Sequence, residues 1–385
     1  MKNSPESKFD KISANARESS ESKSTQTHSK LAHFPIMLFA SVMGIGGLAL
    51  AFKKASVAFG ANADFIDLSA NFAQNQMQNH PQNLTNLSEI FECVSVILGF
   101  ASMEIFALLL GIYGLKIATH FAQFRAEATH QVKINFLSAI PIGALIIITF
   151  LGAFNERESM LFALQIAFYV SAFLQLFLSI FVINFWFSNA MKRHLLSPAW
   201  FIPIVGNLIV PLAGHSAKIS SEFSLFFFAI GCFFWLILTA LITSRLIFEE
   251  SLESKFLPTL FIFIAPPSIF VVDFAALFGG HSTLSLVAYF VALFFMLLML
   301  SLAKAFTRIS FALSWWAFTF PLCAFSIASF EVFLGFGTPL YALFGLFGLV
   351  LAAFAVLFVA YKTLIAMSKG KSTWWSRNAN LKPRV

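Results

Sequence analysis

Long apolar runs alternate with short polar connections along most of the chain. Each run is long and apolar enough to be read as a membrane-spanning helix. The runs lie at 34–52, 89–116, 135–153, 160–187, 199–214, 223–246, 257–279, 283–304, 312–334 and 338–364. Four of the connections, those after the third, fifth, seventh and ninth runs, are short, which predicts antiparallel helical hairpins. The pattern therefore predicts an all-α integral membrane protein with ten spans.

The remaining segments are polar and divide the chain into a membrane domain with flanking tails. Residues 1–32 are rich in Ser, Lys and Glu, which is typical of a disordered tail, here expected in the cytoplasm. The membrane domain is expected at 33–366, and it includes a long extracytoplasmic loop over 53–88 that is rich in Asn and Gln. Residues 367–385 form a basic tail, also expected in the cytoplasm.

Composition and charge exclude a soluble protein and indicate the orientation of the spans. Hydrophobic residues make up 58% of the chain and charged residues only 11%, too few to cover the surface of a soluble protein of this length. Of the 25 Lys and Arg residues, 21 lie in the tails or in the connections after even-numbered spans. The other side holds only Lys53, Lys54, Arg157 and Lys218. This asymmetry predicts a multi-pass protein of the cytoplasmic membrane with both termini in the cytoplasm, and not a nucleic-acid-binding protein.

Helix-breaking residues are confined to the odd-numbered spans. Span 1 carries Gly44, Gly46 and Gly47, and the interior prolines are Pro141, Pro203, Pro211, Pro266, Pro267 and Pro321. An interior proline removes a backbone hydrogen bond, and in lipid the freed carbonyl must face protein or a water-filled cavity. We therefore predict that kinked odd spans line a central pore and that even spans form an outer layer in contact with lipid.

The interiors of the odd spans offer small polar groups but no Lys or Arg. Candidate pore-lining residues are Ser41, Asn207, Ser268 and Thr319. A dedicated dicarboxylate site would require a basic residue, so its absence favours a pathway through which anions pass without being held tightly. No catalytic motif, cofactor-binding motif or metal-ligand cluster is recognisable, so neither an enzyme nor a cofactor is expected.

Four motifs resemble the tellurite-resistance/dicarboxylate transporter family, which includes bacterial TehA, the plant guard-cell slow anion channels, and fungal malate and sulfite transporters. They are "GIGGLALAF" in span 1, "IPIVGN" in span 5, "FIAPPS" in span 7 and "WWAFTFPL" in span 9. The resemblance implies five helical hairpins with pseudo-fivefold symmetry, assembled as a homotrimer with one pore per subunit. It also implies that Phe320, directly before Pro321, plugs the pore. Span 1 departs from the family pattern because it has glycines where a mid-helix proline is expected.

Two functions remain open at this point. The first is an anion channel or uniporter for small anions such as chloride and nitrate. The alternative is a proton-coupled carrier of malate or sulfite, or a tellurite-resistance transporter, which requires an intramembrane group that titrates. Candidates for proton coupling are Glu104 in span 2 and Asp273 in span 7, with Glu331 in span 9 as a further carboxylate. Asp273 and Glu331 lie nearer the ends of their spans, where we expect them to be solvated.

Overall fold

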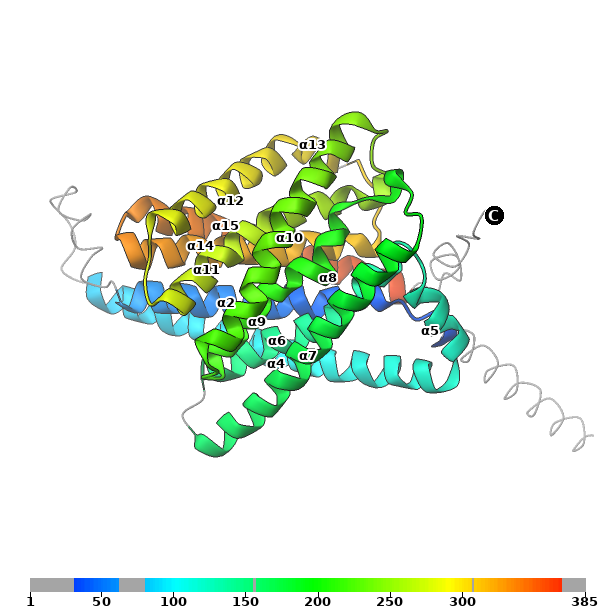
Figure 1. Ribbon diagram of the computed structural model, residues 1–385. Helices are drawn as coiled ribbons and strands as arrows, with labels where there is room; N and C mark the ends of the chain where they lie inside the picture. Colours follow the sequence, from blue (N-terminus) through cyan, green and yellow to red (C-terminus); the bar gives the residue numbers. More distant parts are fainter. Residues whose placement is uncertain (1–30, 62–79, 155–156, 307, 369–385) are drawn as a thin grey trace, which may run out of the picture.

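The computed structural model describes residues 31–61, 80–154, 157–306 and 308–368, and these residues contain ten helical segments long and apolar enough to cross a membrane. The predicted tails at 1–32 and 367–385 lie almost wholly outside the described residues. Figure 1 shows the helices running side by side as one bundle. The described chain begins and ends on one side of it, called here the proximal face, on the right of Figure 1. The opposite side, at which α2 (Phe39–Ala61) ends and α4 (His80–Thr119) begins, is called the distal face.

The ten segments form two layers, as the proline pattern predicts. In the odd-numbered segments between 67% and 83% of the most apolar window is buried, whereas in the even-numbered segments the buried share is 22% to 39%. The inner helices are α2, α6 (Ala139–Gly152), α8 (Phe201–Val205) with α9 (Ile209–Ser216), α11 (Ala265–Phe278) and α14 (Thr319–Phe336). The outer helices are α4, α7 (Glu158–Ser188), α10 (Ser221–Phe248), α12 (Thr283–Ser301) and α15 (Pro339–Ser368). Two short helices, α5 (Phe121–Ala128) and α13 (Ala303–Phe306), lie in proximal connections.

The inner helices contact one another in a closed ring. α2 packs against α6, α6 against α9, α9 against α11, α11 against α14, and α14 returns to α2. Each inner helix also packs against the outer helix that follows it in the chain. This arrangement is compatible with the hairpin prediction, and the pseudo-fivefold symmetry remains a prediction.

Every inner span begins with a 3-10 helix and changes to an α-helix further along. The 3-10 segments are η1 (Ile36–Leu38), η3 (Lys133–Phe136), η5 (Pro198–Trp200), η7 (Ser254–Ile264) and η8 (Leu313–Phe318). In the last four inner spans, a proline is the third residue of the α-helix that follows the 3-10 segment: Pro141, Pro203, Pro267 and Pro321. The first four N–H groups of an α-helix have no partner within the helix, so proline sacrifices no hydrogen bond there.

The kinks of the odd spans remain a prediction. In four of these spans a proline lies near the start of the α-helix that follows a 3-10 segment. Span 5 has a further break, because α8 ends after five residues and a second 3-10 segment, η6 (Gly206–Leu208), separates it from α9.

The connection after span 1 is shorter than the predicted loop over 53–88. α2 continues to Ala61 and α4 begins at His80, so only 62–79 lie between them, outside the described residues. The extension of α2 contains Lys53 and Lys54, whose charges are paired within the bundle. The sequence pattern had predicted that the helix ends before these two lysines. Charge pairing explains why it continues past them.

Candidate functional site

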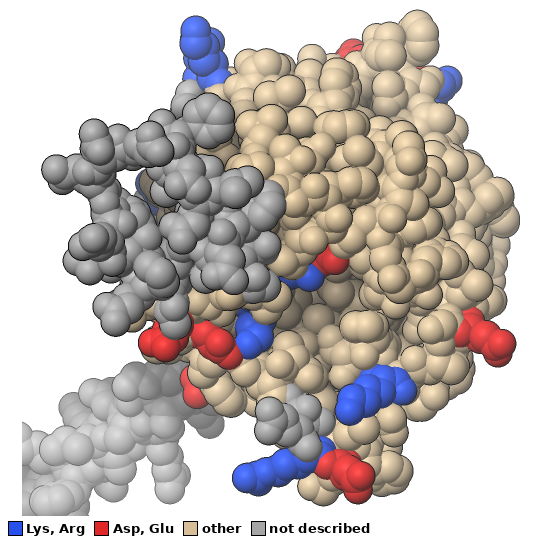
Figure 2. All heavy atoms as spheres, turned by 90° about the vertical axis from the view of Figure 1, so that its left-hand side faces the viewer, with Lys and Arg blue, Asp and Glu red and all other residues tan. Residues whose placement is uncertain are grey.

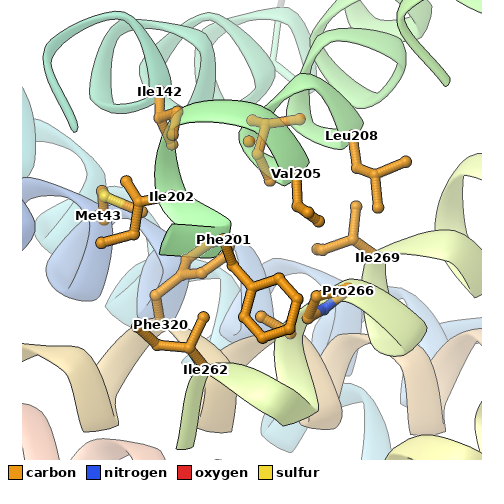
Figure 3. Close-up of a pocket in the computed structure, with 13 residues that line it drawn as sticks. Met43, Ile142, Phe201, Ile202, Val205, Leu208, Ile262, Pro266, Ile269 and Phe320 are labelled. Carbon is orange, nitrogen blue, oxygen red and sulfur yellow. The ribbon is translucent and has the colours of Figure 1, made fainter. Parts of the chain in front are cut away.

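A small cavity lies between the inner helices. Its volume is about 60 Å³, and all the residues that line it are apolar. Every inner span contributes, and no outer helix does. Figure 3 shows representatives from each inner span around the cavity: Met43, Ile142, Ile202, Pro266 and Phe320. Space enclosed by the inner layer is where a solute pathway was predicted.

In three inner spans the residue directly before the third-position proline lines the cavity: Ile202, Pro266 and Phe320. In span 3 the lining residue is Ile142, directly after Pro141. Of these residues only Phe320 was predicted from the sequence to line the pore. Equivalent positions in spans 5 and 7 could have been found by aligning the spans on their prolines.

The side chain of Phe320 is 9% exposed and packs against the first inner helix. A Cβ atom on Gly47 would lie 2.9 Å from Cδ2 of Phe320 and 3.3 Å from Cβ of Cys323. The side chain of Thr319 leaves no room for a Cβ atom on Gly44, and Gly46 is crowded by Ile146 and Ser102. The three glycines of span 1 thus allow α2 to approach its neighbours closely, Gly44 and Gly47 on the side of α14.

The four small polar residues predicted to line the pore do not line this cavity. Ser41 donates to the carbonyl of Leu38 at 2.7 Å, Thr319 to that of Trp316 at 2.7 Å, and Ser268 to that of Ile264 at 2.7 Å. The Asn207 amide donates to the carbonyl of Ile204 at 2.6 Å. These residues satisfy backbone carbonyls near the change from 3-10 to α-helix, where regular i to i−4 bonding is interrupted. That these residues line the pathway outside this cavity remains a prediction.

One carbonyl in the broken fifth span is satisfied by an outer helix. The carbonyl of Pro203 accepts from Gln175 Nε2 at 2.9 Å and from Ser179 Oγ at 2.7 Å, both on α7. The Asn207 amide also donates to Ser179 Oγ at 2.9 Å. A buried carbonyl without a partner is costly, so these outer-helix side chains stabilise the interrupted inner span.

The carboxylates predicted for proton coupling occupy three different environments. Asp273 is 0% exposed, and neither carboxyl oxygen has a hydrogen-bond partner among the described residues, so the expectation that it is solvated is wrong. Glu104 lies on the exposed side of α4, within an outer helix. Glu331 is 8% exposed and ion-paired, so the expectation that it is solvated is also wrong.

Charged groups meet at the distal ends of the inner helices. Lys54 on α2 pairs with Oε2 of Glu331 on α14, and His281 Nε2 lies 3.5 Å from Oε1 of the same carboxylate. Lys53 pairs separately with Glu92 on α4 at 2.6 Å. Figure 2 shows a hollow near the middle of the distal face, with a basic and an acidic side chain together at its edge. From the sequence, these lysines are recognisable only as charges on the sparsely basic side.

The lining of this cavity is wholly apolar. An apolar constriction in a pore opposes the passage of hydrated ions when it is narrow and dry. The Lys54–Glu331 pair is not part of the cavity lining.

Comparisons with known proteins identify the family of this chain. The voltage-dependent anion channel family model matches residues 33–364. The chain is 31% identical over 235 residues to the S-type anion channel SLAH3 of Arabidopsis thaliana, covering 60% of this chain and 36% of that protein. It is 24% identical over 251 residues to the guard cell S-type anion channel SLAC1 of the same plant, covering 64% and 44%.

A bacterial relative matches over more of its own length. The tellurite resistance protein TehA homolog of Haemophilus influenzae is 24% identical over 247 residues, 63% of this chain and 73% of that protein. The chain thus spans less than half the length of the two plant relatives and about three quarters of the bacterial one. The family match covers nearly all of the ten-helix bundle, so this multi-pass membrane protein belongs to the voltage-dependent anion channel family.

Proposed function

We propose that this protein is an anion channel that passes small monovalent anions such as chloride and nitrate, and that the ring of Phe320 closes its pathway. The observation that carries the proposal is the apolar cavity to which all five inner spans contribute and which Phe320 lines. The membership of this protein in an anion channel family supports the same conclusion.

The chemistry of the cavity lining indicates which anions pass most easily. Because all the lining residues are apolar, an anion must shed much of its hydration to cross the constriction. Nitrate is less strongly hydrated than chloride, so we propose that nitrate is the more permeant of the two.

The test is electrical recording from the purified full-length protein in planar bilayers with chloride and nitrate gradients. The wild type is compared with Phe320→Ala. Phe325→Ala is the matched control, because Phe325 is a buried phenylalanine of α14 that stacks on Tyr289 and does not line the cavity.

We expect a small wild-type current and a much larger current in Phe320→Ala, both reversing near the anion equilibrium potential. Phe325→Ala should lower stability without raising the current. A cation-selective current, or equal activation by both substitutions, contradicts the proposal.

A second candidate, a proton-coupled carrier of malate or sulfite, is favoured by one observation. Asp273 is a fully buried carboxyl group without a hydrogen-bond partner, inside an inner helix. Buried carboxyl groups in membrane helices are costly and are often functional.

This carrier candidate predicts pH-driven uptake of malate or sulfite into liposomes, lost in Asp273→Asn. Glu104→Gln is the comparison variant, since Glu104 lies on an outer helix. Channel activity unaffected by Asp273→Asn, together with no uptake driven by a pH gradient, rejects the carrier.

Assembly and orientation are part of the same proposal. Glu104 is exposed within an apolar outer helix, where contact with lipid is unfavourable. We propose that this side of α4 packs against a second copy of the chain in a homotrimer. The excess of basic residues supports a cytoplasmic proximal face. Cross-linking of Glu104→Cys between subunits tests the trimer contact.

A further inference from the structure

The Lys54–Glu331 ion pair lies on the same helix faces as the cavity. Lys54 follows Met43 by eleven positions on α2, and Glu331 follows Phe320 by eleven positions on α14. Eleven residues are close to three turns, which places side chains on one face about 16 Å apart along the axis. Met43 and Phe320 both line the cavity, so the Lys54–Glu331 pair lies between the cavity and the distal face.

The pair combines burial with access from the distal side. The Lys54 side chain is 25% exposed and that of Glu331 only 11%. A quarter of the Lys54 side chain is exposed, so the pair is reached by solvent, while the surrounding low-polarity interior strengthens the attraction of Lys54 for an anion. A carboxylate on the opposite helix is the anion that it holds in this structure.

Glu331 has a second neighbour from a different element. His281, in the connection between α11 and α12, places Nε2 at 3.5 Å from Oε1, whereas Lys54 contacts Oε2. The carboxylate can therefore keep one contact if Lys54 binds another anion. His281 Nδ1 is buried and has no hydrogen-bond partner among the described residues.

We propose that Lys54 is a binding site for a small inorganic anion at the distal end of the proposed pathway. The carboxylate of Glu331, fixed on α14, occupies this site and competes with the anion for Lys54. An incoming anion displaces the carboxylate from Lys54, is held there, and then moves toward the cavity. This inference rests on the proposed channel function and adds a second anion-contacting position, three helical turns from Phe320.

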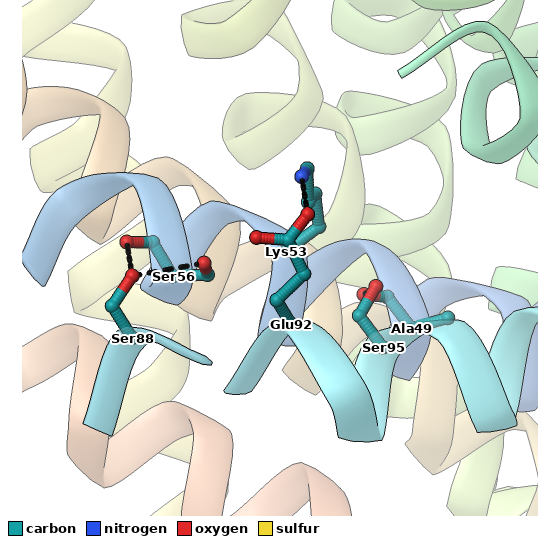
Figure 4. A network of polar contacts seen from close by, with 6 residues as sticks. All are labelled: Ala49, Lys53, Ser56, Ser88, Glu92 and Ser95. Carbon is teal, nitrogen blue, oxygen red and sulfur yellow. Dashed lines mark hydrogen bonds and ion pairs between the residues drawn. The ribbon is translucent and has the colours of Figure 1, made fainter. Parts of the chain in front are cut away.

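The adjacent Lys53 has a different role and provides the control. Figure 4 shows Lys53 paired with Glu92 at the interface of α2 and α4, beside the Ser56–Ser88 and Ser95–Ala49 contacts. The Lys53 ammonium also lies 4.1 Å from the centre of the Phe154 ring. These contacts hold an inner helix to an outer helix, away from α14. Two lysine–glutamate pairs from consecutive residues of α2 can thus be compared directly.

The test uses the full-length protein with Phe320→Ala, so that current is measurable, and varies chloride on the distal side alone. Glu331→Gln should lower the half-saturating chloride concentration at least about threefold, since it removes the competing charge near the mouth. Lys54→Gln should raise the half-saturating chloride concentration by a similar factor, and Lys54→Arg should leave it unchanged. The double variant Lys54→Gln with Glu331→Gln should behave as Lys54→Gln does. Lys53→Gln and Glu92→Gln should leave it unchanged.

A second readout separates failure of this inference from failure of the channel proposal. Chloride NMR line broadening by the purified protein, without the Phe320 substitution, reports binding in the absence of conduction. We expect more broadening with Glu331→Gln and less with Lys54→Gln.

If no variant carries anion current but broadening depends on Lys54 in this way, the channel proposal fails and the site stands. If current is present but the Lys54 and Lys53 pairs respond alike, the site is overturned and the channel stands. Broadening independent of Lys54 likewise overturns the site.

Discussion

The ring of Phe320 lies against the bare backbone of Gly47, so close that a Cβ atom on Gly47 would come within 2.9 Å of Cδ2. Real Cβ atoms almost never approach a neighbour this closely, so any larger residue at this position would force the Phe320 ring or one of the two helices to shift. Phe320 can therefore occupy its position on the cavity because Gly47 on α2 has no side chain.

Gly47→Ala should displace the Phe320 ring and raise the basal anion current. Cys323 limits movement on one side of the new methyl group, with its Cβ atom at 3.3 Å, so the ring or the helix must shift. Overpacking of this kind usually costs about 1–3 kcal/mol of stability. Bilayer recording and thermal unfolding in detergent measure the two effects.

Gly114→Ala is the control for this substitution, because a Cβ atom on Gly114 meets nothing within 4 Å. It lies in outer helix α4, where alanine is a better helix former by about 1 kcal/mol, so current should be unchanged and stability equal or higher. A Gly47→Ala protein that is less stable but carries only wild-type current would mean that Phe320 does not close the pathway.

The two-layer architecture could be predicted from the sequence because breaker residues are confined to alternate spans. Proline has a local physical cost, and its positions therefore indicate which helices are supported by protein on all sides. The 3-10 segments were not predicted, since their apolar composition matches that of an α-helix. Lipid-facing and buried helices are both apolar, so periodicity alone carried little information about helix faces.

The candidate site was only partly predictable, for two physical reasons. Hydroxyl groups such as those of Ser41 and Thr319 can donate to a carbonyl of their own helix turn, so a polar residue on an inner span need not face the pathway. The Lys54–Glu331 pair joins the first and last inner helices. Such a contact depends on closure of the ring between α14 and α2, which no local pattern encodes.

A buried ion pair fixes the proximal end of the bundle. Lys116, at the end of α4, is 0% exposed and donates to Glu127 Oε2 on α5 at 2.7 Å and to the Phe34 carbonyl at 2.7 Å. Tyr113 donates to the same carboxylate oxygen at 3.1 Å. The cluster connects the start of span 1 to the end of span 2 and to the short helix that follows.

Removal of one partner of this buried pair should be strongly destabilising. Lys116→Met leaves the Glu127 carboxylate buried without its counter-ion, and losses of about 3–5 kcal/mol are typical of such changes. Thermal or denaturant unfolding in detergent should show this loss, and Lys116→Met combined with Glu127→Leu should recover much of it. The pair of Arg193 and Glu249, 3.6 Å apart with side chains 64% and 33% exposed, is the control, and its disruption should cost less than about 1 kcal/mol. Equal effects at the two pairs would show that Lys116 is not held by its charge.

The Pro203 carbonyl should show non-additive behaviour when its two donors are removed. Gln175→Leu leaves Ser179 as a donor to this carbonyl and should cost little. Ser179→Ala leaves Gln175 as a donor but also removes the acceptor of an Asn207 N–H, so it should cost more. The double substitution leaves a buried carbonyl unpaired, which should cost about 1–3 kcal/mol beyond the sum of the singles. Unfolding of the four proteins in detergent gives this coupling energy. Ser171→Ala, also on α7, is the control, because among the described residues its hydroxyl donates only to the carbonyl of Ala167, in the same helix. Additive losses would contradict the shared-carbonyl arrangement.

His130 gives the proximal face a pH-dependent element outside the membrane spans. Its Nδ1 atom lies within hydrogen-bonding distance of the backbone N–H groups of Val132, at 3.1 Å, and Lys133, at 3.4 Å. Both N–H groups donate, so Nδ1 must be unprotonated. Burial of the ring, and secondarily the charge of Lys133, lowers the pKa of His130 below its ordinary value. The folded protein thus favours the neutral imidazole.

Stability should therefore fall as the pH drops through the range in which unfolded histidine takes up a proton. The pKa of an unfolded histidine is about 6.5, and the folded value is lower, so between the two the unfolded chain binds more protons. The contribution of His130 is fully present above about pH 6.5 and is lost as the pH falls toward its folded pKa. Thermal unfolding from neutral to mildly acidic pH should show this slope in the wild type and a shallower one in His130→Gln. His194→Gln, at an exposed position, is the control and should keep the wild-type slope. If His130→Gln and the wild type lose stability in parallel, the acid sensitivity arises elsewhere and His130 does not act as the neutral acceptor of this turn.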